Sequence, residues 1–323
     1  MKVQYFVMLF LLVFLSFCVK YDVKQMTLVK ISTEKQRYDS ILESAVNDAA
    51  DVLVSKDRGN KPKIEKERAL ETLFDSMYAG FGILHDETAK QELEEYIPLI
   101  LFTDRDGFYL WYHGEYEENG RCIRGRFSEK YPYSYCFRDP DYKGDTYMGF
   151  TIDDVIYLVE NDTNLVSYGT RQDLSLSFPR ISFLKDEQEF EEIRRKTMIH
   201  AITETINTYI NTNNLIAGNY GITYECAIPY LDDASWARTI DDIAIVVFFQ
   251  GYPYGNRITE TYNQYEIGGA RVNKNTYYYI KNTDGTLVYH RNNCEACSKD
   301  LIPYDSKREC ACMGAYPCKK CRP

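Results

Sequence analysis

The start of the chain constrains its fold more than any other segment. Residues 3–19 read VQYFVMLFLLVFLSFCV, without a charge and with Gln4 and Ser16 as the clearly polar side chains. No proline or glycine occurs from Met1 to Arg58, so nothing there interrupts a helix. A helix over 3–19 covers about 25 Å, at the short end for crossing a hydrocarbon core of about 30 Å. We therefore expect residues 1–20 to form an uncleaved transmembrane anchor.

Two other interpretations of the apolar run stay open. A cleaved signal peptide would begin with Met1-Lys2, but no small-x-small cleavage site follows the run. The residues Leu15-Ser16-Phe17-Cys18 are similar to a lipoprotein cleavage box, although Phe17 is too large for the position before the cysteine. Both interpretations would remove the anchor from the mature chain.

The charges beside the run give conflicting evidence on orientation. A tail as short as two residues usually stays inside while the bulk of the chain is exported. The positive-inside rule instead keeps a basic flank in the cytoplasm, and this flank holds Lys20, Lys24 and Lys30. The expectation of export therefore depends on the family resemblances given below.

Helical periodicity continues after the anchor. Apolar residues from 33 to 54 follow the three-and-four spacing of an amphipathic helix, which Gly59-Asn60-Lys61-Pro62 would end. The expected inner face consists of Tyr38, Ile41, Leu42, Ala45, Val46, Ala49, Val52 and Leu53. Further helices are expected over 65–78 and 187–210.

Strand signals occur in runs separate from these helices. Two apolar runs, 98–103 and 108–112, flank the hairpin turn signal Asp104-Arg105-Asp106-Gly107, and Asn282-Thr283-Asp284-Gly285 predicts a second hairpin. Other strand-like runs are 155–159, 222–228 and 243–249. The absence of a regular βα alternation predicts an α+β fold with helices packed on an antiparallel sheet.

The composition limits the range of functions. A net charge of −10 argues against sequence-independent binding to nucleic-acid phosphates over most of the surface. The 29 tyrosines lie mostly in strand-like segments. They are explained either as half-buried sheet positions with a hydrated hydroxyl, or as an adhesive or glycan-binding surface.

The end of the chain carries the strongest chemical signal. His290-x3-Cys294 and Cys318-x2-Cys321 are two pairs of potential metal ligands from distant segments. A Cys-x2-Cys pair places two thiolates on one turn, and a second pair completes a tetrahedron. Thiolate and imidazole together favour zinc. We expect one Zn²⁺, which stabilises a module too small to fold on its own core.

The pattern Tyr289-His290-x3-Cys294, Ser306-x2-Glu309 and Gly314-x2-Pro317-Cys318-x2-Cys321-x-Pro323 resembles the metal-binding module of Ada-type alkylation-repair proteins. The resemblance implies the ligands His290, Cys294, Cys318 and Cys321. It also implies a short helix that Ser306 caps and Gly314 ends. The first ligand of the repair proteins is cysteine, so the histidine here puts methyl transfer in doubt.

The other cysteines allow alternatives. Cys294-x2-Cys297 with Cys318-x2-Cys321 forms a rival ligand set of zinc-ribbon spacing. In an exported domain, Cys297 could form a disulfide with Cys310 or Cys312, and Cys122 with Cys136. Cys226 lies in a strand-like run and is expected to be a buried thiol.

A membrane helix that runs into an amphipathic helix and then an α+β head resembles the anchored pilin-like components of Tad-type secretion and pilus systems of Gram-positive bacteria. Residues 36–45 (QRYDSILESA) are similar to their post-membrane helix, and Asp106-Gly107-Phe108-Tyr109 to a turn in some of them. No glycine precedes the apolar run as a pre-pilin peptidase site, so a processed, polymerising major pilin is not expected.

These observations predict three parts: an anchor over 1–20, an extracytoplasmic α+β domain over 21–285, and a zinc module over 286–323. The resemblances imply a non-catalytic component of a surface secretion, pilus or conjugation apparatus, with the membrane and other assembly proteins as partners. His85, His113 and His200 lie far apart in sequence and suggest no catalytic site. The alternatives are an accessory protein whose module contacts nucleic acid, and a zinc protein that faces the cytoplasm.

Overall fold

The computed structural model describes residues 3–55, 63–118, 121–138, 145–153, 155–160, 165–219, 236, 239–254, 261–269, 278–283, 286–291, 303–304 and 307–320. The chain forms two compact units, Met1–Ala270 and Arg271–Pro323. The sequence placed the boundary at 285/286 instead. The structure places it earlier because strand β10 (Tyr278–Thr283) pairs along its whole length with β11 (Thr286–Arg291), and the two belong to one sheet.

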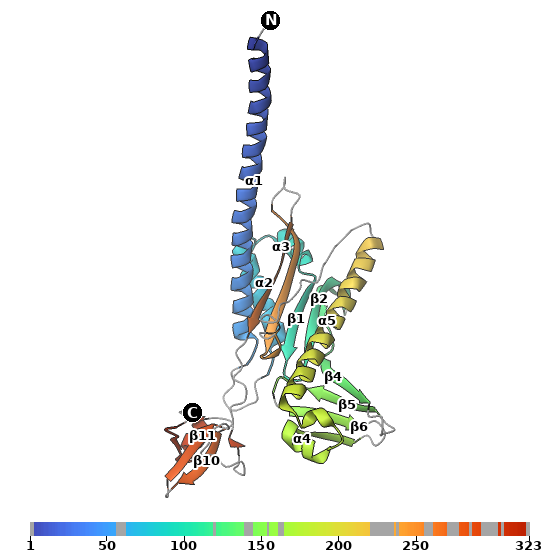
Figure 1. The fold of residues 1–323 in the computed structure, drawn as a ribbon, viewed down its shortest axis with the longest axis vertical. Coiled ribbons are helices and arrows are strands. Elements are labelled where there is room, and N and C mark those ends of the chain that lie inside the picture. The colour runs from blue at the N-terminus through green and yellow to red at the C-terminus, as the bar shows by residue number, and fades with distance from the viewer. Residues whose placement is uncertain are drawn as a thin grey trace. The chain divides into compact units, whose positions relative to one another are not determined.

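Helix α1 (Val3–Val52) runs without a break from the apolar run into the amphipathic segment, as the sequence predicts (Figure 1). Its two parts have opposite surroundings. Large apolar side chains stay exposed in the first part, including Phe10 at 61% and Phe14 at 54%. The buried positions of the second part are Tyr38, Leu42, Ala45, Val46, Ala49 and Ala50, and Leu53 follows them. Over the described residues, no helix combines the length and apolar character needed to cross a membrane.

Two shorter helices follow α1. Helix α2 (Lys66–Phe81) confirms the predicted second helix, and it ends at Gly82, whose φ of 73° suits a residue without Cβ. Helix α3 (Glu87–Glu95) was not predicted. It begins at Asp86, whose carboxylate accepts hydrogen bonds from the backbone N–H groups of Thr88 and Ala89. The N-cap side chain therefore defines a helix that has only a short apolar pattern.

The first unit contains a large antiparallel sheet. Its strand order is β7-β6-β5-β4-β2-β1-β8-β9, with β3 also paired to β2. The predicted hairpin of β1 and β2 and the predicted run in β8 are confirmed, and so is the α+β class. The strands are β1 (Leu99–Asp104), β2 (Gly107–Glu118), β3 (Arg121–Phe127), β4 (Tyr131–Arg138), β5 (Asp145–Phe150), β6 (Val155–Glu160), β7 (Leu165–Thr170), β8 (Ala244–Pro253) and β9 (Thr261–Gly269).

Helices cover the sheet at two places. Helix α1 packs on β8 and β9, where a Cβ on Gly268 would lie only 2.7 Å from the carbonyl oxygen of Val46. Helices α4 (Arg171–Ser177), η1 (Ser182–Leu184) and α5 (Glu187–Asn219) lie over β4 to β7 (Figure 1). The ring of Phe190 in α5 meets that of Phe150 in β5 at 5.7 Å. Helix α5 matches the helix predicted over 187–210.

The second unit holds a four-stranded sheet in the order β12-β10-β11-β13, with β12 (Pro303–Tyr304) and β13 (Tyr316–Pro317). Helix α7 (Lys307–Cys312) precedes β13. Gly314 ends this helix as expected, with a φ of 77°, and the next N–H, of Ala315, donates to the carbonyl of Cys310 at 3.0 Å. Ser306, the expected cap, lies outside the described residues, as does the expected strand 222–228.

Candidate functional site

Of the four expected zinc ligands, His290 lies in strand β11 and Cys318 follows directly after the neighbouring strand β13. Strand β13 runs parallel to β11, with Tyr289 opposite Pro317. The N–H of Cys318 donates to the carbonyl of Tyr289 at 3.0 Å. His290 and Cys318 each follow this pair directly, and both are buried, with 4% and 6% exposed. The fold therefore brings the strand that carries His290 next to the turn that carries Cys318.

The backbone around Cys318 favours its thiolate. The N–H of Lys320 lies 3.4 Å from Sγ of Cys318 and donates to it. A hydrogen bond to the charged form stabilises that form, and a thiolate is the form that binds zinc. The other two expected ligands, Cys294 and Cys321, lie outside the described residues, as does Cys297 of the rival set. Within the described part of the chain, no three metal-binding side chains cluster.

Cys136 and Cys312 are free thiols, so neither forms the disulfide expected for it. Cys136 in β4 stands opposite Tyr147 of β5, whereas Cys122 in β3 stands opposite Glu117 of β2, in a different part of the sheet. Cys310 is fully buried in a small core with Tyr289 and Ala315, so packing explains its place in α7. Cys226 lies outside the described residues.

Residues 36–45, which carry the pilin-like resemblance, form part of the contact between α1 and the sheet. The ring of Tyr38 contacts those of Tyr254, at 5.8 Å, and Tyr262, at 5.5 Å, which also contact each other at 6.3 Å. Its hydroxyl donates to the carbonyl of Pro253 at 3.3 Å. Burial raises the pKa of Tyr38 above its ordinary value. This aromatic contact fixes the second part of α1 to the end of β8 and the start of β9.

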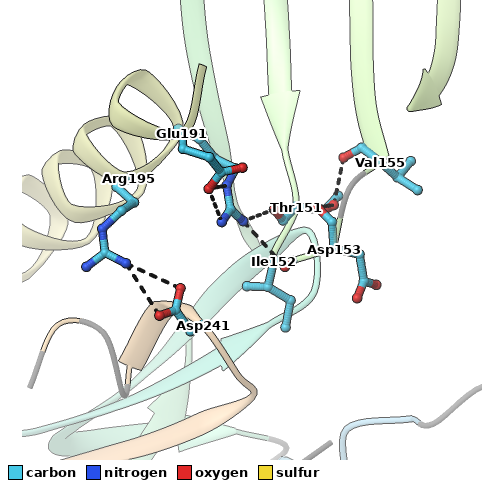
Figure 2. A network of polar contacts seen from close by, with 8 residues as sticks. Thr151, Ile152, Asp153, Val155, Glu191, Arg195 and Asp241 are labelled. Carbon is cyan, nitrogen blue, oxygen red and sulfur yellow. Dashed lines mark hydrogen bonds and ion pairs between the residues drawn. The ribbon is translucent and has the colours of Figure 1, made fainter. Parts of the chain in front are cut away.

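A polar network joins α5 to the connection between β5 and β6 (Figure 2). The guanidinium of Arg194 donates to the carbonyl of Thr151 at 3.0 Å and to the carboxylate of Glu191 at 2.7 Å. Next to it, Arg195 pairs with Asp241 at 3.3 Å. Arg194 is buried. The sequence does not indicate this, because a basic residue on a helix is usually exposed to solvent. Its carbonyl and carboxylate partners indicate a structural role.

The histidines outside the second unit lie in separate elements: His85 between α2 and α3, His113 in β2, and His200 exposed in α5. No protein-family model matches this chain, and neither the curated proteins nor the solved structures include a significant match.

Proposed function

We propose that this protein is a membrane-anchored, non-catalytic extracytoplasmic component of a bacterial surface secretion, pilus or conjugation apparatus, with a structural zinc module at its C-terminal end. The observation that carries the proposal is the division of α1 into an exposed apolar part and a buried part within one continuous helix. This is the layout of the pilin-like components that the sequence resembles.

The exposed part of α1 needs a non-aqueous environment. From Phe10 to Val19 the side chains are uncharged and, apart from Ser16, apolar, and the large ones are 54–67% exposed. Leaving such a surface in water costs about 25 cal/mol per Å². A lipid bilayer removes that cost without requiring another protein. The exposed apolar residues of this part are Met8, Phe10, Leu11, Leu12, Val13, Phe14, Leu15, Phe17, Val19, Tyr21, Val23, Met26, Leu28 and Val29.

The small size of the second unit supports the zinc part of the proposal. Among its described residues, the buried cluster consists of Tyr289, Cys310 and Ala315, with Ile280 and Leu287 packed against it. A unit as short as Arg271–Pro323 gains little stabilisation from a hydrophobic core, so a metal would add what the side chains do not. His290, Cys294, Cys318 and Cys321 would hold the ion in a tetrahedron without an open position for chemistry.

The exposed thiol of Cys136 allows a direct test of location. Intact cells are treated with a membrane-impermeant maleimide, and labelling of the full chain is compared with that of Cys136→Ser. If the head is exported, the wild-type chain gains label before lysis that Cys136→Ser lacks. Extra wild-type label only after lysis would disprove export.

Carbonate extraction tests the anchor, since a Leu12→Lys/Phe14→Lys chain should move from the membrane to the soluble fraction.

Partner capture tests the proposed assembly. A photo-crosslinking amino acid at exposed Leu176 or Leu84 should give adducts with other proteins of the surface apparatus when the protein is expressed in its native cell. A chain that forms adducts only with cytoplasmic proteins would contradict the proposal. Position 200, on the exposed face of α5, provides a second site for the same reagent.

One observation favours a second candidate, an accessory protein whose module contacts nucleic acid. Lys319 and Lys320 are exposed directly after Cys318. Two lysines contribute a short basic patch to a chain of net charge −10. Under this alternative, DNA binding by the full chain would weaken with salt, and Lys319→Gln/Lys320→Gln would reduce that salt dependence. If DNA binding by both chains did not depend on salt, the nucleic-acid alternative would be wrong.

A further inference from the structure

Strands β4 to β7 present two faces of different character. One face is buried under α4, η1 and α5, with Met148, Phe150 and Leu158 fully buried. The other face is open in the part of the chain that the structure describes, and tyrosines stand on it. Tyr147 and Tyr157 are 41% exposed, and Tyr168 is 73% exposed. Because successive side chains of a strand point to opposite faces, these tyrosine rings lie on the face of the sheet that no described helix covers.

The rings form a row across three strands. Tyr157 of β6 stands opposite Tyr168 of β7 and opposite Gly149 of β5. The rings of Tyr157 and Tyr168 are nearly parallel, at an interplanar angle of 20° and a centroid distance of 6.1 Å. Because Gly149 has no side chain, it leaves a gap between Tyr147 and Tyr157. A groove lies at this gap, with Tyr147, Gly149 and Tyr157 in its lining, and Tyr168 stands beside Tyr157 outside that lining.

The groove has a volume of about 310 Å³, near the lower end of the range for ligand pockets. The polar residues among its described lining are Tyr147, Tyr157, Ser134 and Asp106. Asp106, the only acidic residue in that described lining, is paired with Lys130. The described lining of the groove therefore carries almost no net charge, in a chain whose net charge is −10.

We propose that this groove binds a neutral oligosaccharide. The C–H faces of a pyranose ring pack on the flat side of an aromatic ring, and its hydroxyl edges exchange hydrogen bonds with hydroxyl and carboxylate oxygens. The charge of the lining favours a neutral ligand: among the described residues, no lysine or arginine lines the groove to hold phosphates, as a nucleic acid or an anionic polymer would require.

The test uses the full chain in a zwitterionic detergent, since detergents with sugar headgroups would compete. Maltotetraose and chitotetraose serve as probes in titration calorimetry and in saturation-transfer NMR. At least one of them should bind, with saturation transferred to ring C–H protons. Tyr147→Ala/Tyr157→Ala should weaken this binding by about tenfold, whereas Tyr157→Phe, which keeps the ring, should stay within about threefold.

Two further variants make the result specific. Gly149→Val fills the floor of the groove, and its Cβ meets Tyr157 Cβ at 3.6 Å, an ordinary contact that the sheet tolerates. It should weaken binding while every tyrosine remains. Tyr316→Ala removes a 67% exposed tyrosine of the second unit and should change nothing. Failure of both probes to bind, or equal binding by all variants, would overturn the proposal, as would a preference for an anionic oligosaccharide or an apolar peptide.

Discussion

The hydroxyl of Tyr262 in β9 donates a hydrogen bond of 2.7 Å to Oδ1 of Asp39 in α1, between residues 223 positions apart. Tyr262 is fully buried. Both partners belong to the aromatic contact around Tyr38, so this bond helps fix the direction in which α1 leaves the sheet. The sequence places an aspartate beside Tyr38 without showing which distant residue it meets.

Loss of this hydrogen bond should destabilise the first unit. Tyr262→Phe removes the donor and should lower the free energy of unfolding by about 1 kcal/mol, and Asp39→Ala, which leaves a buried hydroxyl unpaired, by about 1–3 kcal/mol. Denaturant unfolding of the full chain in detergent measures both values. Tyr168→Phe, at an exposed ring, provides the control with little change. Equal stability of Tyr262→Phe and Tyr168→Phe would contradict the structural role of the bond.

Alkaline pH should also destabilise the fold. Burial raises the pKa of Tyr133 well above the ordinary tyrosine value of about 10. The folded chain then keeps a proton that the unfolded chain loses, so stability is full below pH 10 and falls as pH rises further. Tyr133→Phe should flatten this decline in a pH series of thermal unfolding. A variant that loses stability as steeply as the wild type would contradict the assignment.

Neighbouring glycines in β9 should respond differently to a methyl group. At Gly268 the new Cβ would lie 2.7 Å from the carbonyl oxygen of Val46 and 2.9 Å from the Cβ of Ala50, so α1 must move away from the sheet. Gly268→Ala should cost about 1–3 kcal/mol of stability. Gly269→Ala meets no atom within 4 Å and should stay within about 0.5 kcal/mol. Equal midpoints of urea unfolding for both variants would argue against the close approach.

Neighbouring arginines in α5 form another matched pair. Arg194→Ala leaves the carbonyl of Thr151 without this donor and should cost roughly 2–4 kcal/mol. Arg195→Ala breaks an ion pair whose side chains are 35% and 38% exposed, and it should cost less than about 1 kcal/mol. Thermal unfolding and limited proteolysis near 151–155 compare the two. A larger loss for Arg195→Ala would reverse the assignment of the structural arginine.

Zinc analysis tests the proposed metal ligands. The full chain should hold about one zinc per molecule, and Cys318→Ala or His290→Ala should lower that content. Cys297→Ala should retain the metal under the His290 set and lose it under the rival set. His200→Ala, at an exposed histidine of α5, controls for nonspecific loss. An unchanged zinc content in Cys318→Ala would show that the proposed ligand set is wrong. Removal of the metal by a chelator should make the second unit sensitive to protease before the first.

Local sequence signals predicted helices α1, α2 and α5, the strands of both hairpins, and strands β6 and β8. Asp104-Arg105-Asp106-Gly107 defines the β1–β2 hairpin through turn chemistry, and Gly314 ends α7 through its positive φ. The inner face of α1 was confirmed from Tyr38 to Leu53, although Ile41 and Val52 are only partly buried. Each of these features depends on residues close together in sequence.

Long-range features were not predictable in the same way. Strand β8 pairs with β1 across a separation of more than a hundred residues, and no local pattern indicates that neighbour. The division of the tyrosines was equally hidden, since Tyr133 is fully buried and Tyr168 mostly exposed. For the metal site, chemistry predicted the ligand types, but the parallel pairing of β11 and β13 that brings His290 near Cys318 depends on the fold of the whole unit.

The continuity of α1 fixes a phase between its two ends. Each residue in an α-helix turns the chain by about 100° and advances it by about 1.5 Å, so every side chain before Tyr38 has a set angle relative to the sheet. One residue inserted between 20 and 36 would rotate the whole apolar part by that angle and leave the head intact. Four inserted residues would nearly restore the original direction while moving the apolar part outward by about 6 Å. In this protein, any change in the length of α1 therefore also sets the direction in which the apolar side chains face relative to the sheet.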